Sequence, residues 1–179
     1  MNRSIPAWQT GGFLFTCIAG TLLHFLFDWS GGTIGAALFS AVNESIWEHL
    51  KLIYVPMLVF AWAEDVAFQK TIPSFWCIKL VGLLTAMVLI PVIYYSYTGI
   101  GGINADWFNI TIFFLVAGIV FYLETRLFQS GWTCKLPPWA AKALIVLIGG
   151  LFILLTFLPP HIPLFRDPLT QSYGYQRNA

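Results

Sequence analysis

The sequence predicts an all-α integral membrane protein, a single domain built as a bundle of five transmembrane helices. Hydrophobic residues make up 58% of the 179 residues and charged residues only 9%, whereas soluble domains carry about 25% charged residues. The apolar residues gather in five segments, each close to the ~20 residues that cross a bilayer as a helix. The eight Trp residues fall near the segment ends, where aromatic rings favour the headgroup region.

The predicted spans are 11–29, 44–63, 75–97, 107–128 and 139–157. The first is longer than the ~7–15 apolar residues of a signal-peptide core, so we interpret it as a retained anchor. The link from Ser30 to Val42 starts with glycines and continues with apolar residues, which predicts a short interfacial or re-entrant helix. Residues 158–179 form a tail, because Pro159-Pro160 ends the last helix.

Lys and Arg are unevenly divided between the two sides of this arrangement. One side carries Arg3, Lys70, Lys79, Arg126, Lys135 and Lys142, and the other only Lys51, Arg166 and Arg177. The positive-inside rule then places the N-terminus in the cytoplasm and the C-terminal tail outside it.

The net charge of +1 argues against a nucleic-acid-binding surface. The three Cys form no C-x-x-C pair, and no disulfide is expected.

This topology gathers polar residues on the extracytoplasmic side, in the end of the first span, the start of the second and the tail. All three histidines, His24, His49 and His161, lie in these parts. The same parts contain Asp28, Asn43, Glu44, Glu48, Lys51, Arg166 and Asp167. Ionisable residues at membrane depth are unfavourable unless paired, so they indicate a functional site.

His24 and Asp28 are one helical turn apart and point the same way. They form either part of a ligand site or a pair that is satisfied against a neighbouring helix. If the second span is helical from Glu44, then Glu44 and His49 diverge unless its first turn is irregular. An ordinary helix start also explains part of this motif, with Asn43 as N-cap and Glu48–Lys51 as an i,i+3 ion pair.

Three histidines with nearby carboxylates suit a divalent metal ion, zinc above all. The expected ligands are His24, His49, Asp28 and His161, and the expected general base is Glu48 or Glu44. The expected substrate-binding residues are Asn43, Lys51, Arg166 and Asp167. The sequence therefore predicts a metal-dependent hydrolase that acts on a lipid or another membrane-presented substrate.

The alternative is a protein without catalysis that binds or transports an ion or small polar solute, or an assembly partner. A transport path needs polar groups through the bundle, and deeper than His24 the sequence offers mainly Thr16, Thr21 and Thr85. Glu124 is predicted to form an ion pair rather than to serve transport. Glu64 and Asp65, at the end of the second span, are predicted to be solvated.

The stretches "LHFLFDWSGG", "FSAVNESIWEHLKL" and "PPHIPLFRDP" resemble a family of small, uncharacterised proteins of the bacterial cytoplasmic membrane with the motif N-E-S-x-W-E-H-L-K. That resemblance implies the organisation of the chain and no catalytic role. A weaker resemblance is to the membrane metal hydrolases grouped with alkaline ceramidases and adiponectin receptors, which use three His and one Asp at one membrane face. Because those proteins have seven spans and a paired H-x-x-x-H, only their chemistry serves as an analogy.

Overall fold

The computed structural model of the protein describes residues 4–68, 72, 74–102 and 104–176. Within these ranges the regular secondary structure is helical, and one isolated antiparallel β-bridge joins Arg166 to Tyr173. Arg3, Lys70 and Arg177, which enter the charge count above, lie outside the described residues. The elements are α1 (Ser4–Trp29), α2 (Ile34–Ala37), α3 (Ile46–Ala67), α4 (Phe75–Gly101), α5 (Asp106–Ser130), α6 (Pro138–Phe157) and the short 3₁₀ helix η1 (Pro163–Phe165).

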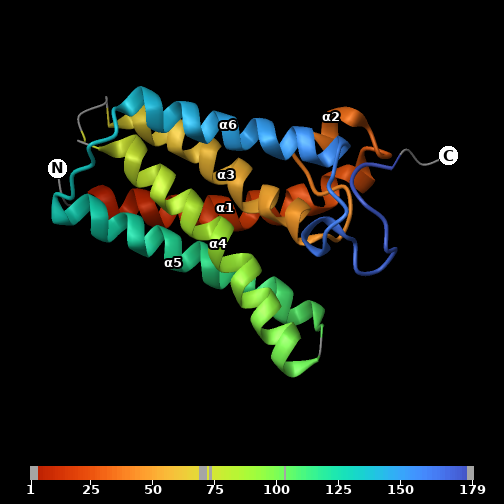
Figure 1. The fold of residues 1–179 in the computed structure, drawn as a ribbon. Coiled ribbons are helices and arrows are strands. Elements are labelled where there is room, and N and C mark those ends of the chain that lie inside the picture. The colour runs from red at the N-terminus through yellow and green to blue at the C-terminus, as the bar shows by residue number, and fades with distance from the viewer. Residues whose placement is uncertain (1–3, 69–71, 73, 103, 177–179) are drawn as a thin grey trace.

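The five long helices, α1, α3, α4, α5 and α6, form one elongated bundle (Figure 1). α1 packs against α3 and α5, and α4 packs against α3, α5 and α6. The second half of α4 and the first half of α5 extend away from the other helices, and the two termini lie at opposite ends of the molecule (Figure 1). We call the end that holds His24 and His49 the histidine end, and the end where α1 begins the amino end.

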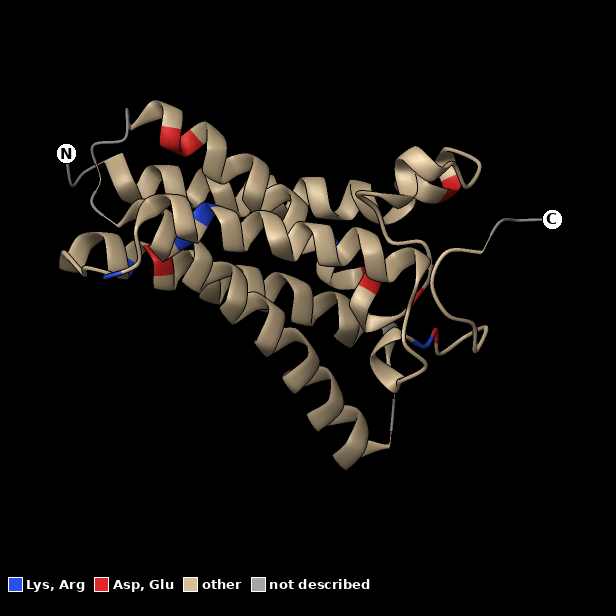
Figure 2. Cartoon of the chain, turned by 45° about the horizontal axis from the view of Figure 1, so that its top comes forward, with Lys and Arg blue, Asp and Glu red and all other residues tan. Residues whose placement is uncertain are grey.

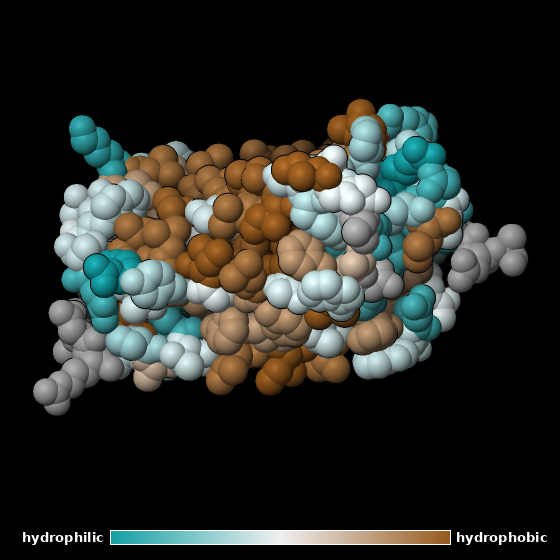
Figure 3. All heavy atoms as spheres, turned by 90° about the horizontal axis from the view of Figure 1, so that it is seen from below, coloured by the Kyte–Doolittle hydropathy of each residue, from teal (hydrophilic) through white to brown (hydrophobic). Residues whose placement is uncertain are grey.

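Four helices are long and apolar enough to cross a membrane: α1, α4, α5 from Trp107, and α6. α3 is not among them, and it carries charged residues towards both of its ends. A broad hydrophobic band separates two more hydrophilic ends (Figure 3), and the charged residues lie near those ends (Figure 2). The all-helical class is therefore confirmed, with four of the five predicted spans supported by length and composition.

The predicted boundaries differ from the structure mainly where helices continue into polar or aromatic sequence. α1 begins at Ser4 rather than near residue 11, and α4 continues to Gly101. In the link between the first two long helices, Thr33 caps the single turn of α2. The predicted N-cap at Asn43 is wrong, because Ser45 is the N-cap of α3 and its side chain accepts from the amide of Glu48.

The expectation of no disulfide is also wrong. Cys77 in α4 and Cys134 in the connection before α6 form a disulfide with a Cα–Cα distance of 6.4 Å. Their separation of 57 positions left no local pattern to read, because only the packing of α4 and α6 brings them together. Cys17 is a free, buried cysteine.

The tail after α6 folds back over the histidine end. Phe165 of η1 is buried, and its ring lies 4.7 Å from that of Trp47, which lies 4.7 Å from that of Phe152. Gly174 has a positive φ of 59°, and a Cβ atom there would lie 2.5 Å from the carbonyl oxygen of Thr156. Glycine is therefore required where the tail crosses the end of α6.

Candidate functional site

His24 of α1, His49 of α3 and Glu44 of the preceding link meet at the histidine end. Glu44 lies between the two rings: its Oε1 is 3.9 Å from His24 Nε2, and its Oε2 is 3.4 Å from His49 Nε2. The two imidazole rings are 5.2 Å apart. One potential ligand atom from each of the three residues lies within 4.8 Å of the other two.

The start of α3 explains how Glu44 reaches both histidines. Because Ser45 is the N-cap and the helix begins at Ile46, Glu44 lies outside the helix and is not bound to its geometry. The side chain therefore turns toward His49, which a continuous helix from Glu44 would not allow. The pattern Ser45-x-x-Glu48 is the signature of a capping box and could have indicated this start.

The Nε2 atoms of both histidines face Glu44, so the hydrogen bonding of their Nδ1 atoms decides whether Nε2 has a lone pair free for a metal ion. His49 Nδ1 lies 2.9 Å from the carbonyl oxygen of Ser45, an arrangement in which Nδ1–H donates and Nε2 keeps its lone pair. Histidines that ligate metals commonly have such a partner, which fixes the tautomer and the ring orientation. His24 Nδ1 is buried and has no hydrogen-bond partner.

The three side chains match zinc in ligand type, and their spacing approaches that of a zinc site. Zinc binds imidazole nitrogen and carboxylate oxygen at ~2.0–2.2 Å, which places the ligands of a tetrahedral site roughly 3.3 Å apart. Glu44 Oε2 lies 3.4 Å from His49 Nε2, which matches this spacing, and Glu44 Oε1 lies 3.9 Å from His24 Nε2. One ligand atom from each residue lies within 4.8 Å of the others, so the side chains would have to move closer together around an ion. Two His and one Glu is a known ligand set of catalytic zinc, with a fourth position open.

The other two predicted ligands lie outside this group of three. Asp28 is exposed and lies one turn beyond His24 on the same side of α1. His161 is exposed in the tail, and its ring packs edge-on against Tyr173 at 4.7 Å. Of the four predicted ligands, His24 and His49 therefore meet, together with Glu44, whereas Asp28 and His161 are not part of this group.

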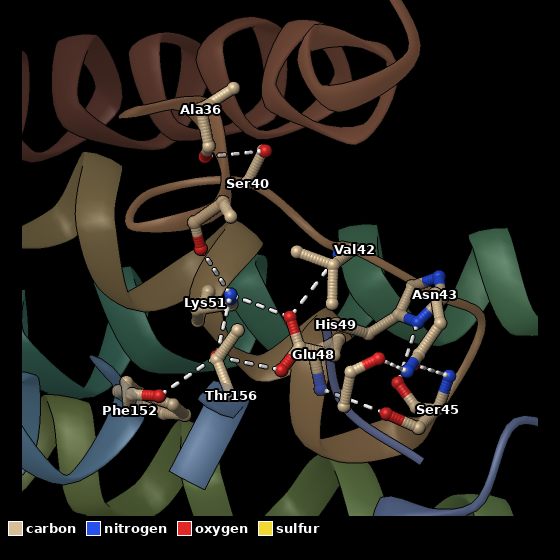
Figure 4. A network of polar contacts seen from close by, with 12 residues as sticks. Ala36, Ser40, Val42, Asn43, Ser45, Glu48, His49, Lys51, Phe152 and Thr156 are labelled. Carbon is tan, nitrogen blue, oxygen red and sulfur yellow. Dashed lines mark hydrogen bonds and ion pairs between the residues drawn. The ribbon is translucent and has the colours of Figure 1, made fainter. Parts of the chain in front are cut away.

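Glu48 and Lys51 belong to a separate, buried network (Figure 4). Lys51 Nζ lies 2.5 Å from Glu48 Oε2 and donates to the carbonyl oxygen of Ala37 and to Thr156 Oγ1, both at 3.0 Å. Glu48 also accepts from the Thr156 hydroxyl at 2.8 Å and from the amide of Val42 at 3.2 Å. The side chains of Glu48 and Lys51 are each 1% exposed.

This network corrects the predicted geometry of both residues. Glu48 does not converge with His24 and His49, because its carboxylate points into the protein toward Lys51 and α6. The Glu48–Lys51 pair is an i,i+3 pair as predicted, but it is fully buried rather than on the surface. Thr156, 108 positions from Glu48, could not be paired with it from the sequence.

Asn43 and Asp167, both predicted to bind substrate, join the tail to the loop that carries Glu44. The Asn43 side chain donates to the carbonyl oxygen of Gly174 at 3.1 Å. Asp167 is buried and accepts from the amides of Glu44 at 3.4 Å and Leu169 at 2.7 Å. Arg166 is exposed. Asn43 and Asp167 therefore hold the backbone around Glu44 against the tail.

Sequence reasoning missed a second cluster, at the amino end. Glu64 and Asp65 are buried rather than solvated. Glu64 and Glu124 both form ion pairs with Lys79, so the predicted ion pair of Glu124 is confirmed and joins α5 to α4. The sequence did not identify Lys79 or Glu64 as members of this cluster, because they lie on helices other than that of Glu124.

Comparisons with known proteins add a family and no activity. No curated protein and no solved structure matches this chain. A family of unknown function, DUF6512, matches residues 2–175. This match includes every helix and the docked tail. The chain therefore belongs to the DUF6512 family.

Proposed function

We propose that this protein is a five-span protein of the bacterial cytoplasmic membrane that binds a divalent metal ion, best matched by zinc, through His24, Glu44 and His49. α3 is the fifth span. Its charged residues are compatible with a membrane because Glu48, Lys51 and Glu64 are all buried within the protein. The N-terminus is cytoplasmic and the histidine end is extracytoplasmic.

The observation that carries this proposal is the meeting of three ligand atoms within 4.8 Å from separate parts of the chain. Their side chains are partly accessible, with 32% of each histidine and 43% of Glu44 exposed. A metal ion could therefore enter, and a fourth ligand position would face outward. The tail and the capped start of α3 hold the loop of Glu44 in place without the metal.

The reaction that fits this ligand set is hydrolysis of a lipid or another membrane-presented substrate. A zinc ion bound there would polarise the scissile group and lower the pKa of a bound water. Glu44 is engaged with the histidines and Glu48 is buried, so Asp28 is the nearby exposed carboxylate that could accept a proton. The Phe25 ring lies 5.0 Å from that of His24 and stacks on Trp29 at 5.7 Å. Both Phe25 and Trp29 are exposed, as expected where a helix meets lipid headgroups.

Elemental analysis of the purified protein tests metal binding. We expect about one zinc ion per chain in the wild type, and almost none in a His24→Ala/His49→Ala variant, because one carboxylate alone is a weak zinc ligand. The matched control is His161→Ala, which removes an exposed histidine outside the cluster and should retain the metal. Zinc absent from the wild type, or retained by the double variant, would contradict the site.

Activity is tested separately, with the zinc-loaded protein in vesicles of mixed phospholipids and sphingolipids. Hydrolysis products that disappear in Asp28→Asn while zinc content stays unchanged would support the catalytic proposal. Full zinc occupancy without any product, combined with solute uptake by the same vesicles, would favour binding or transport instead. Apolar side chains such as Ile53, Met57 and Leu83 fill the bundle between its two ends, which favours a site open to one side.

Reporter fusions at the two termini test the topology. We expect a reporter that is active only in the cytoplasm to work at the N-terminus, and one active only outside it to work at the C-terminus. This follows from an odd number of spans and from the Lys and Arg count. If α3 does not span the membrane, both termini will report the same side.

A further inference from the structure

The buried cluster at the amino end joins four helices. It consists of Gln9 from α1, Glu64 from α3, Lys79 from α4 and Glu124 from α5, and each side chain is 3% exposed or less. Each residue lies within two turns of the end of its helix. Gln9 is separated from His24 by about 22 Å of helix, at 1.5 Å per residue. The cluster is therefore independent of the proposed metal site.

Lys79 is the centre of the cluster. Its Nζ lies 2.6 Å from Glu64 Oε2 and 2.5 Å from Glu124 Oε2. The amide of Gln9 donates to the second oxygen of Glu64, at 2.5 Å. The surroundings are apolar: the Lys79 Nζ lies 5.4–5.7 Å from the ring centres of Phe75, Phe121 and Phe128.

The charges of the cluster do not balance if every group is ionised. Two carboxylates then face one ammonium group, which leaves one excess negative charge in the interior. The neighbouring charged groups do not compensate it, because Asp65 and Lys142 pair with each other at 3.6 Å and Arg126 is exposed. An unpaired buried charge is strongly unfavourable, and a buried group usually becomes neutral instead.

The hydrogen-bonding pattern also indicates a missing donor. Glu124 Oε1 and Gln9 Oε1 are buried acceptors without a hydrogen-bond partner. Glu124 Oε1 lies against Gly82, where a Cβ atom would collide with it. The glycine thus makes room for a carboxyl group that Lys79 binds through only one of its two oxygens. A proton on one carboxyl would remove the excess charge and would add a donor.

We propose that this cluster is a proton-binding site, in which Glu64 and Glu124 share one proton around Lys79. Like charges held around one site cannot both persist in an apolar interior, so the pair binds its proton as a unit. The proton exchanges with water at the amino end of the bundle. The bundle thereby gains a site that can gain or lose a proton, separate from any chemistry at the histidine end.

Infrared spectroscopy of the protein in lipid at neutral pH tests this proposal. The wild type should show the carbonyl band of a protonated carboxyl group, and that band should shift in D₂O. Glu64→Gln and Glu124→Gln should each abolish it, because the remaining carboxylate then pairs with Lys79 as an ion. The matched control is Asp65→Asn, which changes the neighbouring carboxylate and should leave the band in place.

The result in the wild type does not depend on any variant. Absence of the carboxylic band from the folded wild type overturns the proposal, as does a band that survives both single substitutions.

Thermal unfolding provides a second measurement. Each single Gln variant should unfold close to the wild-type temperature, whereas Glu64→Gln/Glu124→Gln should unfold at a lower temperature, because Lys79 then has no anionic partner and must be buried either unpaired or deprotonated. Single variants that unfold at a temperature as low as that of the double variant would show that Lys79 needs both carboxylates ionised, and would contradict the shared proton.

Discussion

Replacing Lys51 with methionine is expected to destabilise the folded bundle by about 3–5 kcal/mol, the range for removing one partner of a buried ion pair. All three N–H groups of the Lys51 ammonium are used, by Glu48, by Thr156 and by the carbonyl oxygen of Ala37. Methionine has a similar length but no charge, so the Glu48 carboxylate stays buried without a cation. The loss therefore comes from the unpaired charge more than from packing.

Unfolding in a fixed detergent, followed by circular dichroism, measures this effect. Glu48→Gln/Lys51→Met should recover much of the loss, because it removes both charges, and the resulting cycle gives the coupling between them. Lys135→Met is the matched control: Lys135 is exposed, and replacing a surface lysine should change the stability by about 0.5 kcal/mol or less. Equal effects of the two substitutions would show that the Lys51 network is not a major source of stability.

The position of this network explains why its loss would also affect the candidate site. Lys51 and Glu48 bind the link through Ala37 and Val42, and they bind α6 through Thr156. The carbonyl oxygen of Thr156 accepts from the amide of Tyr175 at 2.7 Å, which fixes the tail. Glu44 lies between the link and the tail, so the network holds it beside the histidines. If zinc binds there as proposed, Lys51→Met should therefore lower the zinc content as well as the stability.

The helices were predictable because hydropathy is a local property. Each predicted span lies almost entirely within an observed helix, although α1 begins earlier, at Ser4, and α4 ends later, at Gly101. The longer helices also explain why the prediction that Glu64 is solvated was wrong. α3 continues to Ala67 and α1 covers it from Ser4 onward, so Glu64 is enclosed by protein. Burial by neighbouring helices leaves no mark in the sequence of one helix.

The site was predictable in part for the same reason. His24 and His49 stand out as rare ionisable residues near the ends of apolar segments, and the short link brings their helices together. The roles of Glu44 and Glu48 could not be separated without the helix start at Ser45, which puts one outside the helix and the other inside the bundle. Thr156 and the Cys77–Cys134 disulfide depend on contacts between distant segments, and a single sequence does not contain them.

Gly20→Ala is expected to weaken the proposed metal site without changing any of its ligands. Gly20 lies one turn before His24, where α1 crosses α3, and a Cβ atom there would lie 2.5 Å from the carbonyl oxygen of Leu52 and 2.6 Å from the ring of Phe113. Because a backbone oxygen cannot turn aside as a side chain can, α1 must move away from α3. Overpacking of this kind destabilises a protein by about 1–3 kcal/mol.

The same displacement moves His24 away from Glu44 and His49, and we expect zinc affinity to fall about 10–100-fold, the loss typical when the support of a ligand is altered. Competition with a chelating zinc indicator measures it. Gly11→Ala is the control on the same helix, since the nearest atom to its Cβ would be Phe60 Cζ at 3.9 Å. That variant should bind zinc normally and be slightly more stable, because alanine favours the helix by up to ~1 kcal/mol. Destabilisation by Gly20→Ala with unchanged zinc affinity would show that the spacing of α1 and α3 does not set the geometry of the histidines.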